Sequence, residues 1–406
     1  MIESILNNNL KIACVLIIVL TVYVLIKFRN TKYNVSLVSS ATPVSKLAFS
    51  CILFTSGLDI GLIMFPLMEF NKYKNPEYLG INPLSVEIGF WGGAVWIFYF
   101  LTTFYFAYIE VKVKLFENNK MKFILALLML LTCAFTANLF VIFFKFYFSD
   151  FSVEQYQDLF THTTIVMITV GLLFLSTLSA LKVRFIKILS YFSIFLFIVL
   201  VVIGVVLNIT NKSAVLFLST LSLGIFDYIK NIYLFVIPMN EHHQFYMFWW
   251  FSWSLMIGKF VASFVPNGMT PIGLFILMLV VPTALLAIWF TVLYLFSLEH
   301  NSVPIYYFMI MSIVGLLFIV NSFDSILRVS ADLVMKSTKL KKYNYALLFS
   351  YLLLVIFFIG YTGFISSSEG FIKIDYTGTL AIFIIYYMLY NLIKQKFKRG
   401  KYCNVI

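Results

Sequence analysis

The sequence predicts an all-α membrane protein that crosses the bilayer about eleven times. Of its 406 residues, 62% are hydrophobic and only 11% are charged, whereas soluble domains are roughly half apolar and about a quarter charged. Apolar runs of about 20 residues, the length of a membrane-spanning helix, recur along the whole chain. The strands of an outer-membrane barrel would instead alternate apolar and polar residues. The composition therefore excludes a soluble enzyme and a β-barrel.

Hydropathy places each span. The eleven expected helices cover residues 10–28, 47–70, 88–109, 123–146, 163–181, 188–207, 245–265, 274–296, 305–327, 345–362 and 379–393. Segment 214–238 is apolar but is interrupted by Gly224, Asp227, Lys230 and Asn231, so we expect an interfacial helix there. Segment 394–406 is a short basic tail, and residues 1–406 form one integral membrane domain.

The charges predict the orientation. If the loop after the first span is cytoplasmic, 21 Lys and Arg residues lie on that side and seven on the other. Because cytoplasmic loops collect positive charge, we expect a multi-pass protein of the plasma (inner) membrane with its N-terminus outside and its C-terminus in the cytoplasm. The net charge of +12 then reflects topology and not a nucleic-acid partner. The four cysteines show no spacing typical of disulfides or zinc.

The second span contains the sequence TSGLDIG at 55–61, with an ionisable Asp59 near its middle. Gly57 and Gly61 flank this carboxylate, and Pro66 follows. We expect the helix to loosen here, because irregular backbone within a membrane is tolerated where it lines a cavity, as in transporters. The alternative is a buried Asp59 that caps a local turn or is protonated against a neighbouring helix.

The ninth span carries polar groups at its end. Asp324 and Arg328 are four residues apart, and we expect them to pair on one helix face. Asn321 and Ser322, one turn earlier, suit a Na⁺ shell and a helix–helix hydrogen bond equally well. Lys259, inside the seventh span, is expected to extend its amine to the membrane surface.

Five of the six tryptophans fall into two clusters. The first cluster lies at 91–99, and a regular helix would place its three aromatic residues on one face. The second cluster lies in the sequence FWWFSW at 248–253. Two such faces would form an aromatic cage for a quaternary ammonium group through cation–π attraction. The competing interpretation is an interfacial aromatic belt. The residues are Trp91, Trp96 and Tyr99, and Trp249, Trp250 and Trp253.

The histidines do not form a catalytic set. His242 and His243 are expected at a surface turn, and neither His162 nor His300 has a Ser or Cys partner at a telling spacing. The sequence contains no phosphate loop and no metal motif. We therefore expect no enzyme activity, no cofactor and no metal site.

Segment 245–260, FYMFWWFSWSLMIGKF, resembles the signature helix of the betaine/choline/carnitine transporter family, in which a Trp-rich core precedes a glycine. The order and spacing of further segments are similar to the family from about residue 20 to residue 330. These segments are SGLDIGL at 56–62 with Glu69 beyond it, Trp91-Gly92 with Trp96 and Tyr99, VPT at 281–283, WFT at 289–291, and NSFDS at 321–325.

The resemblance implies a leucine-transporter-like core of two inverted five-helix repeats. These repeats would cover residues 47–207 and 245–393, with the interfacial helix 214–238 between them. The helix at 10–28 would be peripheral and would correspond to the family's second helix, so that the family's first helix has no counterpart here. Members of the family are often trimers, which makes a homotrimer the implied assembly.

The resemblance also implies roles for particular residues. Trp91, Trp96, Tyr99 and Trp250 would form the central substrate box, and Trp249 and Trp253 would line the pathway. Gly57, Asp59 and Gly61 would form an unwound segment that contacts substrate and coupling ion, which would be Na⁺ or H⁺. Asn321 and Ser322 would lie at an ion-coupling site, at the position where the family has a Thr-Ser pair.

Three features depart from the family. Asp59 replaces the middle glycine of the family's glycine triple, segment 262–270 lacks the usual arginine, and long charged tails are missing, so osmotic activation is not expected. The resulting hypothesis is a secondary transporter for choline, glycine betaine, carnitine or a similar solute, working by alternating access. The alternatives are a non-transporting relative that acts as a sensor and a membrane-embedded transferase.

Overall fold

The computed structural model describes residues 2–34, 44–57, 61–150, 161–298, 303–338, 340, 342–363 and 372–399. Within them the chain is helical, and no strand occurs. The principal helices are α1 (Ile2–Lys27), α2 (Lys46–Gly57), α3 (Gly61–Glu69), α4 (Pro83–Gly89), α5 (Val95–Phe104), α6 (Glu110–Val113), α7 (Asn119–Asp150), α8 (His162–Ala180), α9 (Val183–Asn211), α10 (Ala214–Lys230), α11 (Glu241–Ala262), α12 (Pro271–Phe275), α13 (Val281–Ser297), α14 (Ile305–Ser337), α15 (Tyr343–Gly363) and α16 (Ile374–Arg399).

The all-α polytopic membrane class is confirmed. In the described part of the chain, nine helical stretches are long and apolar enough to cross a membrane. Helices also occupy the two other expected spans. Each of α2 and α3, in the second expected span, is short, and α11, in the seventh, is not among the nine although most of it is buried. The number of crossings therefore depends on counting α2–α3 and α11 as spans.

The third expected span is longer and less regular than predicted. Continuous helical structure runs from Pro83 to Val113, with π-helical turns at Phe90–Ala94 and Tyr105–Ile109. Asn82 starts the helix five residues earlier than expected, because its side chain accepts a hydrogen bond from Leu84 N and Pro83 occupies the first turn. This earlier start brings residues 83–87 into the helix.

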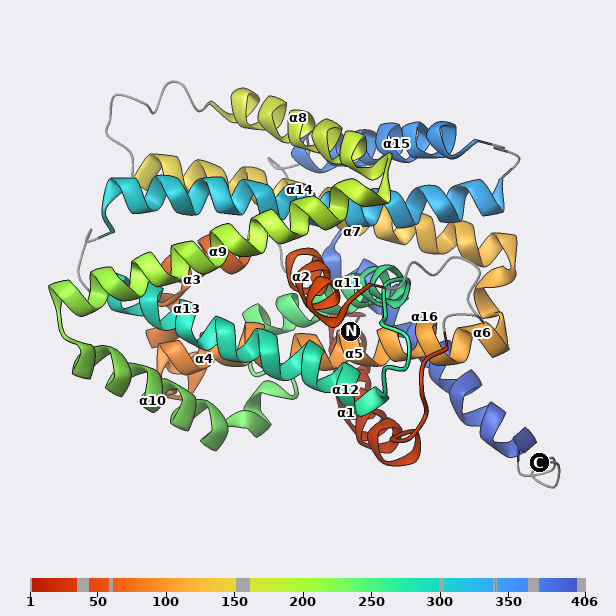
Figure 1. Cartoon of the computed structure of the whole chain (residues 1–406), viewed down its shortest axis with the longest axis horizontal. Coiled ribbons are helices and arrows are strands. Elements are labelled where there is room, and N and C mark those ends of the chain that lie inside the picture. The colour runs from red at the N-terminus through yellow and green to blue at the C-terminus, as the bar shows by residue number, and fades with distance from the viewer. Residues whose placement is uncertain are drawn as a thin grey trace.

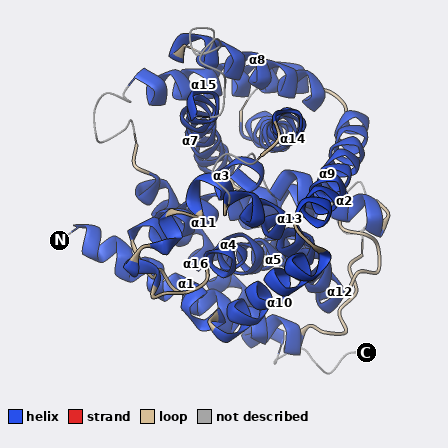
Figure 2. Ribbon diagram, turned by 90° about the vertical axis from the view of Figure 1, so that its left-hand side faces the viewer, coloured by secondary structure: helices blue, strands red, loops and turns tan. Residues whose placement is uncertain are grey.

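The helices form two groups, which Figure 2 shows end-on. α7, α8, α14 and α15 pack against one another, and they run side by side along the long axis in Figure 1. α4, α5, α10, α12 and α13 lie in the other group with α1 and α16. α3 and α11 lie between the groups, and α9 contacts α14 on one side and α13 on the other.

Glycines allow α11 to approach two neighbours closely. A Cβ added to Gly258 would lie 2.8 Å from the backbone carbonyl carbon of Thr102 on α5. On the other side, a Cβ on Gly378 of α16 would lie 2.6 Å from the carbonyl oxygen of Phe248. Larger residues at either position would push helices apart, because packed interiors have little spare volume.

The expected interfacial segment contains α10, followed by a 3₁₀ turn at Ile232–Phe235. The Ser213 side chain caps α10 by accepting a hydrogen bond from Leu216 N. α10 packs against α4, α9 and α13, and Figure 1 shows it crossing obliquely at one end of the bundle. Its outward face presents apolar side chains, including those of Leu223 and Phe226.

Candidate functional site: aromatic and polar clusters beside α2 and α3

Two helices of the second expected span, α2 and α3, flank the glycine segment. α2 ends at Gly57 and α3 begins at Gly61. Asp59 falls in residues 58–60, outside the described part of the chain. A Cβ added to Gly57 would lie 3.3 Å from the Trp96 ring and 3.5 Å from the Tyr99 ring, so the end of α2 lies directly against these two aromatic side chains.

Beside α3, five buried rings form an aromatic cluster. Trp91 lies 6.0 Å from Trp249 and 6.1 Å from Trp250 between ring centroids, in edge-on geometry. Tyr246 stacks on Trp250 at 5.6 Å and lies 5.4 Å from Trp91. Phe65 of α3 contacts Trp91 and Trp249. Offset and edge-on pairs at these separations are the favourable aromatic geometries.

The predicted box is divided between two places. The structure brings Trp91 together with Trp249 and Trp250, whereas Trp96 and Tyr99 form a second pair, 5.7 Å apart, beside Gly57. The sequence-based rotation of 100° per residue does not hold here, because Phe90–Ala94 form a π turn, in which each residue turns the helix by a smaller angle. Trp96 Nε1 donates to the Trp91 carbonyl oxygen at 2.9 Å within this run.

Hydrogen bonding separates the Trp side chains into two kinds. Trp249 Nε1 and Trp253 Nε1 both donate to Thr136 Oγ1 on α7, at 3.0 and 3.1 Å. This shared acceptor fixes one face of α11 to α7. Among the described residues, Trp91 Nε1 and Trp250 Nε1 are buried without a hydrogen-bond partner. Two polar atoms of the aromatic cluster are therefore available to a ligand.

A buried acidic cluster, which the sequence analysis did not identify, adjoins the aromatic cluster at Tyr246. Glu69, at the end of α3, accepts from Tyr73 Oη at 2.7 Å and from Tyr246 Oη at 2.5 Å. His242 Nε2 lies 3.1 Å from Glu69 Oε1, and its Nδ1 lies 2.8 Å from Tyr78 Oη. A neutral His242 that donates through Nε2 and accepts through Nδ1 satisfies both contacts.

Glu87 is the second carboxylate of the acidic cluster, and it comes from α4. Its side chain is fully buried, and neither oxygen has a hydrogen-bond partner among the described residues. The pKa of Tyr73 lies well above its usual value, first because the ring is buried and then because Glu69 and Glu87 place negative charge nearby. The Tyr73 side chain thus lies close to both carboxylates.

The expectation of a surface turn at His242-His243 is wrong. Both residues lie in the first turn of α11, where Asn240 accepts from His243 N, and the His243 side chain is completely buried. Its ring stacks on Phe90 at 4.2 Å, and its Nδ1 accepts from Met239 N. The dipeptide was misread because two adjacent polar residues after an Asn resemble a loop, although they also begin a helix.

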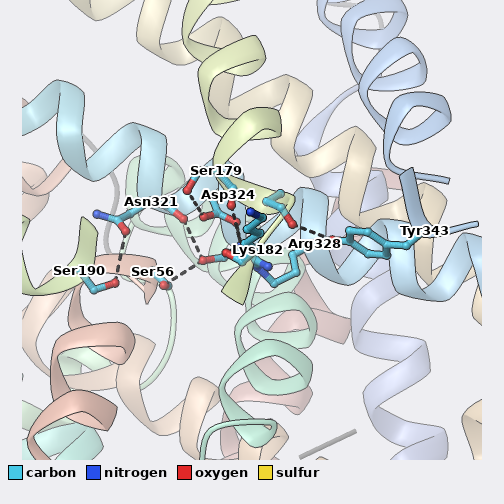
Figure 3. A network of polar contacts seen from close by, with 10 residues as sticks. Ser56, Ser179, Lys182, Ser190, Asn321, Asp324, Arg328 and Tyr343 are labelled. Carbon is cyan, nitrogen blue, oxygen red and sulfur yellow. Dashed lines mark hydrogen bonds and ion pairs between the residues drawn. The ribbon is translucent and has the colours of Figure 1, made fainter. Parts of the chain in front are cut away.

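Near its C-terminal end, α2 contacts polar groups on α14 (Figure 3). Ser325 Oγ lies 2.9 Å from Ser56 Oγ, next to Gly57. Asn321 Nδ2 donates to Ser193 Oγ at 2.8 Å, and Asn321 Oδ1 accepts from Ser190 Oγ at 3.3 Å. The Asn321 side chain therefore joins α14 to α9 in this conformation. Ser322 is buried on the same helix.

Asp324 and Arg328 pair as expected, with 2.8 Å between Oδ1 and Nη2 (Figure 3). Ser179 Oγ also donates to Asp324 Oδ2 at 2.6 Å, and Arg328 donates to the carbonyl oxygens of Ser179 and Lys182. We call these groups the arginine network. It joins α14 to the end of α8, which is a structural role. Lys259 lies over the Phe106 ring, 5.1 Å from its centroid.

The described residues contain no group of three His, Cys, Asp or Glu side chains placed to hold a metal ion. No protein-family model matches the chain, and no curated protein matches it in sequence. The family resemblance therefore stays a prediction, and the geometry of the aromatic cluster is the basis for the function proposed below.

Proposed function

We propose that the chain is a secondary transporter that moves a quaternary ammonium or betaine-type solute across the plasma membrane by alternating access. The proposal includes the orientation predicted by the charges, with the N-terminus outside. It also includes coupling to Na⁺ or H⁺ at the segment that contains Asp59. The carrying observation is the aromatic cluster beside α3.

The chemistry of the cluster suits a cation without hydrogen-bond donors. A quaternary ammonium group has no N–H to satisfy, so it is held by ring faces, and Trp gives the strongest cation–π attraction. The unpartnered Nε1 groups of Trp91 and Trp250 are donors suited to a carboxylate or hydroxyl elsewhere on the solute. The rings now contact one another, so entry of a solute requires α3 or α11 to move.

The arrangement of helices supports the transporter architecture. The third and fourth helices of the first expected repeat are α7 and α8, and those of the second expected repeat are α14 and α15. All four lie in one group, whereas the first and second helices, α2–α5 and α11–α13, lie in or beside the other. Alternating access in transporters of this kind is rocking of one bundle against another around a central site.

The binding test compares two buried tryptophans. Trp250→Leu removes a ring of the aromatic cluster, and Trp289→Leu is the matched control because Trp289 is equally buried on α13, where it packs against Phe197. A desolvated cation–π contact contributes about 2 kcal/mol, which is roughly a 30-fold change in affinity. Titration of purified protein with choline and glycine betaine, followed by tryptophan fluorescence, should show this weakening for Trp250→Leu alone.

Uptake into proteoliposomes completes the test. The wild type should accumulate labelled choline or glycine betaine under an ion gradient, and Asp59→Asn should lose or uncouple that accumulation. Binding without flux would replace the transporter by a sensor. Equal binding by both Trp variants, or no binding of any quaternary ammonium compound by the wild type, would contradict the proposed substrate class.

A further inference from the structure

The two carboxylates of the acidic cluster have unequal surroundings. Glu69 receives hydrogen bonds from Tyr73 and Tyr246 and lies within ion-pair distance of His242. Glu87 is as deeply buried, but among the described residues no donor meets hydrogen-bond geometry at either of its oxygens. Only Glu69 therefore has the donors that a buried negative charge needs.

A second charge in this place would be strongly unfavourable. An ionised carboxylate buried without donors loses its hydration and gains nothing in exchange. Glu69, which is already stabilised as an anion, would repel it. Glu87 can avoid both penalties by holding a proton. As a carboxylic acid, Glu87 has a hydroxyl that can donate a hydrogen bond. The Tyr73 hydroxyl donates its own hydrogen bond to Glu69, so its oxygen can accept one from Glu87.

Titratable side chains from several neighbouring elements surround Glu69 and Glu87. α3 contributes Glu69, the 3₁₀ turns at Lys72–Lys74 and Pro76–Tyr78 contribute Tyr73 and Tyr78, and α11 contributes the histidines and Tyr246. His243 Nδ1 accepts from the backbone, so its buried Nε2, which has no partner in the described structure, carries the proton of a neutral ring. The cluster therefore contains more negative than positive groups.

A surface cavity provides a route for a proton. A cavity of about 550 Å³ is lined by Tyr73 and by residues of the loop before α4 and of α10, including Asn82 and Asp227. Tyr73 is therefore shared between this cavity and the two carboxylates. Asp227 also accepts a hydrogen bond from Asn82 N, which fixes α10 against the start of α4 beside the cavity.

We propose that Glu87 is a proton-binding site, occupied while α3, α4 and α11 pack as in this structure and emptied when they separate. One proton passes from a hydronium ion, through the cavity at Tyr73, to a Glu87 carboxylate oxygen; one O–H bond of the hydronium breaks, one O–H bond forms on Glu87, and a water molecule is left. Separation of the helices would hydrate the carboxyl group and release the proton. This inference deepens the proposed function, because it names a proton as the coupling ion. That part of the inference rests on the proposed function.

Proton binding is tested without any solute. Infrared difference spectra of the full-length protein in lipid nanodiscs, recorded against pH at constant Na⁺, should contain a carboxylic-acid C=O band. The band should shift in D₂O and should be missing from Glu87→Gln. Glu77→Gln, which removes an exposed carboxylate of the neighbouring turn, should retain it. Glu87→Gln should fold normally, because the amide resembles the protonated acid, and its thermal midpoint checks this.

Two results would overturn the assignment. A band that persists in Glu87→Gln belongs to another carboxyl group, and a band that disappears on adding Na⁺ at constant pH identifies a metal cation as the ligand. Uptake of labelled choline supplies a separate readout. An inward proton gradient should accelerate it in the wild type and not in Glu87→Gln. If no variant takes up choline while the band behaves as described, the solute proposal fails and the proton site stands.

Discussion

Asp324 and Glu69 are both buried carboxylates, but they are stabilised in different ways. Asp324 has a permanent cation beside it, because Arg328 stays protonated at every physiological pH. Glu69 is held by hydrogen bonds from two tyrosine hydroxyls and by a histidine, and none of these groups is a permanent cation. The arginine network is therefore suited to a fixed join between helices, whereas the acidic cluster is suited to a contact that forms and breaks with the movement of protons.

The largest expected effect is loss of the permanent cation. Arg328→Leu would leave Asp324 buried and unpaired, which costs about 3–5 kcal/mol of stability. Lys336→Leu is the matched control, because it breaks an exposed pair with Asp332 at the same spacing of four residues, and such pairs contribute about 0.3–0.5 kcal/mol. Thermal denaturation in detergent should separate the two variants clearly. Similar losses would show that the arginine network has no special structural role.

The next effect concerns the anchor of the aromatic cluster, which uses neutral hydrogen bonds. Thr136→Val keeps the shape of the side chain but leaves the indole N–H groups of Trp249 and Trp253 without their acceptor. We expect a loss of about 2–4 kcal/mol, since each unsatisfied buried donor costs about 1–3 kcal/mol. Thr132→Val, whose hydroxyl bonds only the backbone of its own helix, should cost much less in the same denaturation measurement.

The two glutamates of the acidic cluster should respond differently to the same substitution. Glu69→Gln removes the negative charge that Tyr73, Tyr246 and His242 stabilise, so we expect a loss of about 1.5–3 kcal/mol, the range for hydrogen bonds to a charged group. Glu87→Gln should leave the unfolding midpoint nearly unchanged. Parallel denaturation of both variants at neutral pH checks the difference. A reversed order would assign the charge to Glu87.

The smallest effect is a dependence on alkaline pH. Burial raises the pKa of Tyr78 to about 12 from its usual 10, so the folded protein keeps this proton in a range where the unfolded chain loses it. The contribution of Tyr78 to stability is complete below pH 10 and is lost as the pH rises towards 12. Tyr78→Phe should therefore flatten the fall in stability across this interval. An unchanged slope in the variant would contradict the assignment.

The arginine network and the acidic cluster also differ in how far sequence reasoning could identify them. Asp324 and Arg328 are four residues apart on one helix, so their pairing follows from helical geometry alone. Glu69 and His242 are distant in sequence, and only tertiary packing brings them together. One local signal was available, since Asn82-Pro83 is typical of a helix start and would have placed Glu87 inside the third span.

The aromatic residues show where a regular pattern stops being informative. Hydropathy located helices at all eleven expected spans, whereas the loosening expected at Asp59 falls in residues 58–60, outside the described part of the chain. The prediction that Trp91, Trp96 and Tyr99 share one face assumed a regular α-helix, whereas residues 90–94 form a π turn. Such turns depend on packing against neighbouring helices, which a helical projection of the sequence does not include.

The two indoles that share Thr136 have a mechanical consequence. A sliding movement of α11 along α7 would break both hydrogen bonds together, whereas a rotation centred on the Thr136 hydroxyl would preserve them. Thr136 is thus placed as a pivot between the two groups of helices. A rotation of this kind would carry the two ends of α11 in opposite directions, so that the end bearing His242 opens while the end bearing Lys259 closes.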